Sequence, residues 1–264
     1  MVIDFHTHCF PDRIVARAMA SLVRNSGIIN PYIDGSLADL RRYMKQFGID
    51  RSVVLNIATN PAQQKNVNDF AIEANAADTI MFGSVHPAAP DAMEELYRIR
   101  ENGLLGIKLH PDYQDFFVDD PAVFPIYETA AKLGLITVFH AGQDCGIFEP
   151  VHCTPERLAK ALPAFGGGKV VAAHFGGYLL WYEVEEQLVG KELYFDTSYC
   201  CGRIPKGQAQ RIIQNHGADK ILMGSDLPWS GTENEMGFLR ALGLSEKEEA
   251  AVMGGNAARL LGIS

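Results

Sequence analysis

Eight short apolar stretches, most of them followed by a helix-like segment, constrain the fold of this chain more than any other feature. Each stretch is nearly continuously apolar, as is typical of strands buried on both faces of a parallel sheet. The predicted strands begin near Val2, Arg51, Ile80, Leu104, Leu135, Lys169, Leu193 and Lys220. Eight strand and helix units within 264 residues predict one closed (β/α)8 barrel of the TIM type, a single domain over residues 1–264.

Capping residues and apolar periodicity place the helices between these strands. Ser36, with Asp39 three residues on, resembles a capping box that opens a helix over 37–47, which Gly48 ends. The stretch 10–35 is rich in Pro, Asn and Gly and is predicted to be a loop. Further helices are predicted from residue 61 to about 77 and over 91–102, 122–132, 155–165, 178–189, 205–216, 245–253 and 256–261.

The charge balance favours small molecules as partners. A net charge of -9 argues against nucleic acid or an anionic membrane, because both attract basic surfaces. No apolar run reaches the roughly 20 residues of a membrane-spanning helix, and Asp4, His6 and His8 stand where a signal peptide would carry lysines. A cytoplasmic protein is expected. The five cysteines are an odd number without a framework spacing, so free thiols are expected.

Most of the eight histidines fall at the ends of predicted strands. His6 and His8 alternate with Thr7 on an extended strand, so their side chains point the same way and can share a metal ion. The carboxyl ends of barrel strands meet at one rim, where catalytic residues gather. The other candidates at this rim are His86, Lys108, His110, His140, His174 and Asp226, whereas His152 and His216 are expected at the surface.

Several motifs in this order resemble the amidohydrolase superfamily, in particular the branch that contains aminocarboxymuconate-semialdehyde decarboxylase and related metal-dependent hydrolases. They are Asp4-Phe5-His6-Thr7-His8, Gly106-Ile107-Lys108-Leu109-His110-Pro111, Phe139-His140-Ala141-Gly142, Ala173-His174-Phe175-Gly176-Gly177, Phe195-Asp196-Thr197-Ser198, Gly224-Ser225-Asp226-Leu227-Pro228-Trp229 and the closing Gly255-Asn256-Ala257-Ala258-Arg259-Leu260-Leu261. The resemblance runs from residue 2 to about residue 262.

The resemblance implies that His6, His8, His140 and Asp226 bind one divalent metal, with zinc expected. It places His174 beside the metal. A divalent cation lowers the pKa of bound water. Asp226 is then expected to accept a proton from that water, and His174 to orient the water and to stabilise the oxyanion or protonate the leaving group. The alternative for the whole set is buried polar side chains that are satisfied by their neighbours.

Lys108 has two interpretations. In two-metal members of the superfamily a lysine at the end of the fourth strand is carboxylated and bridges the metals, so a second metal remains an alternative. An unmodified Lys108 would instead bind a substrate carboxylate. Other expected substrate-binding residues are His110, Arg203 and Trp229, and rim aromatic residues form either an apolar wall or part of the core: Phe10, Tyr113, Phe116, Phe117, Trp181 and Trp229.

The principal functional prediction is a metal-dependent hydrolase in which metal-activated water attacks an amide, lactone or ester of a small molecule. The alternative is a non-oxidative, metal-dependent decarboxylase of an aromatic or dienoic acid. A deoxyribonuclease and a barrel that only binds a ligand are weaker alternatives, because Lys108 stands where the nuclease needs glutamate and because the predicted ligand set is complete. A homodimer is compatible with the family.

Overall fold

Eight parallel strands form a barrel in the computed structural model, which describes residues 1–27, 30–147 and 149–263. The strands are β1 (Ile3–Thr7), β2 (Arg51–Leu55), β3 (Thr79–Phe82), β4 (Gly106–Leu109), β5 (Ile136–Phe139), β6 (Val170–Ala172), β7 (Tyr194–Asp196) and β8 (Ile221–Leu222). They pair as two parallel sheets, β1 to β3 and β4 to β8. Isolated bridges from Gly83 to Ile107 and from Thr7 to Leu227 link the sheets at both edges. The predicted (β/α)8 barrel is confirmed.

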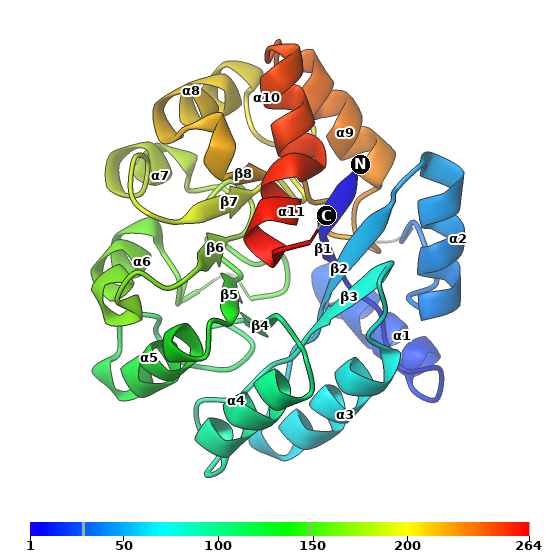
Figure 1. Cartoon of the computed structure of the whole chain (residues 1–264), viewed down its shortest axis with the longest axis vertical. Coiled ribbons are helices and arrows are strands. Elements are labelled where there is room, and N and C mark those ends of the chain that lie inside the picture. The colour runs from blue at the N-terminus through cyan, green and yellow to red at the C-terminus, as the bar shows by residue number, and fades with distance from the viewer. Residues whose placement is uncertain (28–29, 148, 264) are drawn as a thin grey trace.

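Helices surround the strands (Figure 1). They are α1 (Val15–Ser26), α2 (Leu37–Phe47), α3 (Gln64–Ala74), α4 (Ala92–Glu101), α5 (Phe124–Lys132), α6 (Pro155–Ala161), α7 (Trp181–Gln187), α8 (Lys206–His216), α9 (Thr232–Ala241), α10 (Glu246–Ala250) and α11 (Asn256–Leu261). Short 3₁₀ helices are η1 (Pro61–Gln63), η2 (Pro121–Val123), η3 (Leu162–Phe165) and η4 (Ala218–Lys220), and η5 (Ala251–Gly255) is a π-helical turn.

The helix α2 begins at the cap that its sequence predicts. The α2 bounds agree with the prediction, and the Ser36 hydroxyl accepts a hydrogen bond from the Asp39 backbone N–H. The prediction of a loop over 10–35 is wrong, because α1 lies within it; residues 28–29 of that stretch lie outside the described residues. Helix α9 was also not predicted. Both α1 and α9 begin without a side-chain cap, but so do α4 and α8, which were predicted, so a missing cap does not by itself explain the omission.

The barrel interior is apolar at its amino-terminal end. Inward-facing side chains such as Phe5, Phe82 and Val138 form one cluster with residues of α11, which therefore closes this end. On β4 the inward position next to Phe82 is Gly106, where a Cβ atom would lie 2.3 Å from the phenyl ring. Lys108 is two residues further along the same face of the strand. Its side chain therefore starts above the apolar layer, toward the rim.

Two histidines predicted at the surface are buried. His152 is 5% exposed and its Nδ1 lies 2.9 Å from Oδ1 of Asp112, whereas His216 is 3% exposed, stacks on Phe195 and approaches the Leu193 carbonyl through Nε2. The surface prediction is wrong because these partners are distant in sequence. All five cysteines are free, as expected. Within the described ranges, no helix has both the length and the apolar character needed to cross a bilayer.

Candidate metal centre

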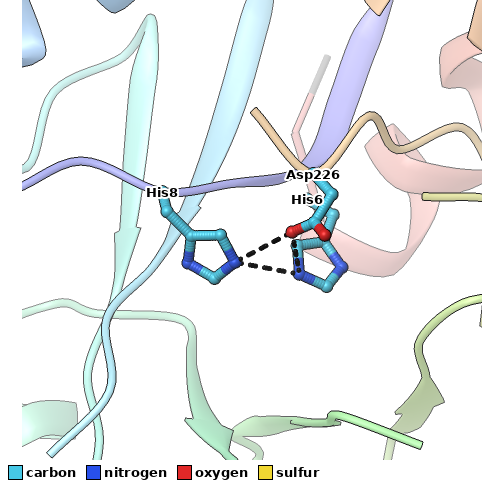
Figure 2. A group of neighbouring side chains, drawn as sticks. All are labelled: His6, His8 and Asp226. Atoms are coloured by element: carbon cyan, nitrogen blue, oxygen red, sulfur yellow. Dashed lines mark hydrogen bonds and ion pairs between the residues drawn. The ribbon is translucent and has the colours of Figure 1, made fainter. Parts of the chain in front are cut away.

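Three predicted ligands meet where β1 and β8 end (Figure 2). Nε2 of His6 lies 3.2 Å from Nε2 of His8, and Oδ1 of Asp226 lies 3.4 Å and 3.1 Å from these two nitrogens. His6 is 1% exposed and Asp226 is 8% exposed. Three ligand atoms at such separations, in a buried site, can contact one ion.

The fourth predicted ligand lies in an adjoining pair. Nδ1 of His140, after β5, is 3.1 Å from Nε2 of His174, after β6. The His174 ring in turn lies 5.3 Å from the His6 ring, centroid to centroid. His140 is thus beside the group of His6, His8 and Asp226 without belonging to the same compact triad. The five residues form one continuous polar cluster across the barrel mouth.

The second ring nitrogen of each of these histidines faces an acceptor. Since a neutral imidazole carries one N–H, a nitrogen that donates outward leaves the inward nitrogen with a free lone pair. Nδ1 of His6 is 2.8 Å from Oδ2 of Asp196, Nδ1 of His8 is 2.8 Å from the Leu55 carbonyl, Nε2 of His140 is 3.2 Å from the Gln143 carbonyl, and Nδ1 of His174 is 2.9 Å from the Ser198 carbonyl. This arrangement leaves each ring with an inward nitrogen that can bind a metal or accept a proton.

Burial sets the charge of the cluster. Burial and the nearby Lys108 ammonium together lower the pKa of His6 to about 4, although Asp196 and Asp226 act in the opposite direction. Burial also holds the pKa of His140 well below its usual value. For Asp226 burial acts in the opposite direction, but the adjacent His6 and His8 outweigh it and the pKa is lowered. Neutral imidazoles beside an ionised carboxylate are the donor set that a divalent transition metal prefers.

Asp196 at the end of β7 supports this cluster, although it was not assigned a role from the sequence. Its side chain is fully buried. In addition to His6, its carboxylate accepts hydrogen bonds from the backbone N–H groups of His174 and Ser198. The only sequence signal was its place in the motif at residues 195–198 and at a strand end.

A second buried group contains His110, His140 and Asp144, but its hydrogen bonds argue against a metal. The Tyr113 backbone N–H donates to Nδ1 of His110, which places the ring proton on Nε2, 3.5 Å from Oδ2 of Asp144. Burial raises the pKa of Asp144, but hydrogen bonds from His110 and the N–H groups of Gly146 and Ile147 outweigh it, and the net pKa is lowered. Asp144, which the sequence did not single out, thus acts as an acceptor.

Lys108 is a buried cation to which the described residues offer no hydrogen bond. It is 1% exposed, and among the described residues its Nζ has no hydrogen-bond acceptor. Burial lowers its pKa to about 8, while Asp196 and Asp226 oppose that shift. A charged amine that gives up water without gaining a hydrogen bond is costly, so this position is suited to an anion or to a covalent modification of the amine.

The other predicted substrate-binding residues occupy different surroundings. Arg203 is exposed in the loop after β7, and its guanidinium lies 3.6 Å above the Tyr199 ring centroid. Trp229 is half-buried after β8. Both ring nitrogens of His110 are engaged, and the ring stacks between Tyr113 and His140. His86 lies apart from the cluster, and its Nδ1 accepts the Ala88 N–H.

A sequence model of the amidohydrolase family matches residues 3–263. No curated protein matches the chain significantly. Among solved structures, 5-carboxyvanillate decarboxylase from Sphingomonas paucimobilis is similar with a TM-score of 0.75 and 18% identity, over 100% of this chain and 99% of that one.

Two further solved structures resemble the chain to a similar degree. 2,6-Dihydroxybenzoate decarboxylase from Rhizobium has a TM-score of 0.74 and 16% identity, over 99% of this chain and 98% of that one. Dihydroxybenzoic acid decarboxylase from Polaromonas, with bound manganese and 2-nitroresorcinol, has a TM-score of 0.72 and 16% identity, over 99% of this chain and 96% of that one. At these identities the likeness establishes the fold alone.

Proposed function

Since this chain belongs to the amidohydrolase family, we propose that it is a metal-dependent decarboxylase of a small aromatic or dienoic acid. The observation that carries the proposal is the Lys108 ammonium group, which is buried beside the histidine cluster and has no hydrogen-bond acceptor within the described part of the chain. An acidic substrate would supply the missing partner. The decarboxylases among the similar structures also favour this activity over the hydrolase that the sequence first suggests.

In this proposal His6, His8, His140 and Asp226 hold one divalent metal. The inward nitrogens and the ionised carboxylate support that assignment. When bound, the metal would act as a Lewis acid toward substrate oxygens. Zinc remains the metal proposed from the sequence, and manganese is a second candidate because the Polaromonas neighbour contains it.

The chain's own residues then bind the acid and move one proton. Lys108 orients the substrate carboxylate inside the mouth, and Arg203 attracts it at the outer edge. Asp226 and His174 relay a proton from water to the carbon that bears the carboxylate. The bond between this carbon and the carboxylate carbon then breaks, its electron pair returns to the conjugated π system of the substrate, and carbon dioxide leaves. Apart from the proton consumed, no co-reactant is required.

Hydrolysis of an amide, lactone or ester is the second candidate, because the same ligands can activate water. The two candidates differ in their products. Protein loaded with zinc or with manganese is incubated with 2,6-dihydroxybenzoate, 5-carboxyvanillate and a set of neutral lactones and amides, with Asp226→Asn as the control. We expect carbon dioxide and the decarboxylated product from an acid. Hydrolysis of a neutral substrate without turnover of any acid would overturn the proposal.

A further inference from the structure

Glu235 on α9 is a fully buried carboxyl group that contacts two rim loops at once. The Ser230 hydroxyl, in the loop after β8, donates to its Oε1 at 2.8 Å. The backbone N–H of Cys201, in the loop after β7, donates to its Oε2 at 2.9 Å. One side chain therefore links two loops that are about thirty residues apart in the chain.

These two loops carry the proposed substrate-binding residues Arg203 and Trp229. The Cys201 carbonyl accepts a hydrogen bond from Nη1 of Arg203 at 3.2 Å, so the residue that Glu235 binds also contacts the arginine. In the other loop, the Asp226 carbonyl accepts the Trp229 N–H at 2.7 Å and the Ser230 N–H at 3.4 Å. Glu235 thus binds Cys201, whose carbonyl holds Arg203, and it binds Ser230, which follows Trp229 in the chain.

The supporting helix is well anchored. Met236 and Leu239 of α9 are buried in the main apolar core, so the Glu235 backbone is fixed relative to the barrel. Removing this carboxyl would leave the Cys201 N–H and the Ser230 hydroxyl without the acceptor that they have in the structure, and an unsatisfied buried donor is unfavourable. The loops could regain hydrogen bonds only by moving toward water.

We propose that Glu235 is a positioning residue that fixes the spacing between Arg203 and Trp229 and thereby tunes the site for a carboxylate-bearing substrate. This inference rests on the proposed function for its substrate class. The link between the loops is a property of the chain that can be tested without turnover.

The test compares Glu235→Ala with Glu235→Gln in manganese-loaded protein. Glutamine can accept the Cys201 N–H and donate to the Ser230 hydroxyl, so it should preserve the link. Glu156→Ala is the matched control, since the side chain of Glu156 is exposed on α6 and pairs with Lys160, which lies in neither loop. Hydrogen exchange is followed in peptides covering 198–207 and 226–231, together with kcat and KM for 2,6-dihydroxybenzoate and the Kd of benzoate.

We expect Glu235→Ala to exchange faster in both peptides and to raise KM and the benzoate Kd at least tenfold, with kcat within threefold and metal content unchanged. Glu235→Gln and Glu156→Ala should match the wild type. Unchanged exchange and affinity in Glu235→Ala would overturn the proposal, as would an equal loss in Glu235→Gln. So would a kcat loss without a KM change.

If Glu235→Ala does not fold, Ser230→Ala removes one of the two bonds and should raise exchange in 226–231 alone; no local change would overturn the proposal. If the wild type releases no carbon dioxide from any acid, the proposed function fails. Exchange and benzoate affinity would still decide whether Glu235 positions the loops.

Discussion

Nδ1 of His6 lies 2.8 Å from Oδ2 of Asp196, and this contact joins the first strand of the barrel to the seventh. Neither side chain is accessible to solvent beyond 1%. The carboxylate fixes the imidazole proton on Nδ1, so that Nε2 can face His8 and Asp226 as a ligand. The orientation of the first metal ligand therefore depends on a residue 190 positions away in the chain.

Asp196→Asn should weaken metal binding. The amide cannot provide the same negative charge to the His6 ring, and loss of such a partner typically lowers metal affinity by about 10–100-fold. Titration of apoprotein with zinc in the presence of a competing chelator measures the change. Asp78→Asn, which alters an exposed ion pair with Arg41 and a contact with the Thr79 hydroxyl at the start of β3, is the control. Wild-type affinity in Asp196→Asn would show that this contact does not support the metal site.

Asp226→Asn should keep the fold and lose turnover by about three orders of magnitude. The substitution removes a proton acceptor and a negative metal ligand together. Circular dichroism and kcat for the best acid substrate are the measurements. Turnover within tenfold of the wild type would exclude Asp226 as the proton-transferring group.

Lys108→Met should stabilise the protein while weakening acid binding. Methionine has a similar length but no charge, and the Lys108 ammonium has no hydrogen-bond partner among the described residues. The substitution should therefore raise the free energy of unfolding by on the order of 1–3 kcal/mol. We expect a higher Tm and at least a tenfold higher benzoate Kd, with the metal stoichiometry still one. A stoichiometry that falls from two to one would instead indicate a carboxylated Lys108 that bridges two metals.

Glu235→Gln should remove part of the pH dependence of stability. Burial raises the pKa of Glu235 to about 8 from an ordinary value of 4.5. The folded chain thus binds a proton that the unfolded chain releases, and the stability from this protonated group is full below about pH 4.5 and lost as pH rises to about 8.

Denaturant unfolding at pH 5 and pH 9 tests this prediction. The wild type should lose more free energy of unfolding across this range than Glu235→Gln, by at most about 5 kcal/mol. Parallel pH profiles for the two proteins would show that Glu235 ionises normally in the folded state.

Patterns that are local in sequence predicted the barrel well. Apolar runs predicted all eight strands, and the Ser36 cap predicted α2. Helices α1 and α9 were missed, whereas α4 and α8, which also begin without a side-chain cap, were predicted from their apolar periodicity. His152 and His216 were placed at the surface because nothing near them in sequence indicates the Asp112 carboxylate or the Phe195 ring that buries them.

In the candidate site, too, local sequence patterns predicted some residues, whereas others depend on contacts between distant parts of the chain. Strand ends predicted that His6, His8 and Asp226 would meet, because the rim position follows from the βα repeat. The supporting residues Asp144, Asp196 and Glu235 were not assigned roles, since each acts through hydrogen bonds to another loop or strand. A sequence read in order does not reveal such tertiary pairs.

The central claim is that His6, His8, His140 and Asp226 share one divalent metal, and anomalous diffraction at the absorption edge of zinc or manganese tests it most directly. For crystals of metal-saturated protein, we predict one peak within about 2.0–2.3 Å of Nε2 of His6, Nε2 of His8, Nδ1 of His140 and an Asp226 oxygen. His8→Ala crystals should lose most of this peak. A peak among His110, His140 and Asp144, or no peak within reach of His6 and Asp226, would contradict the account.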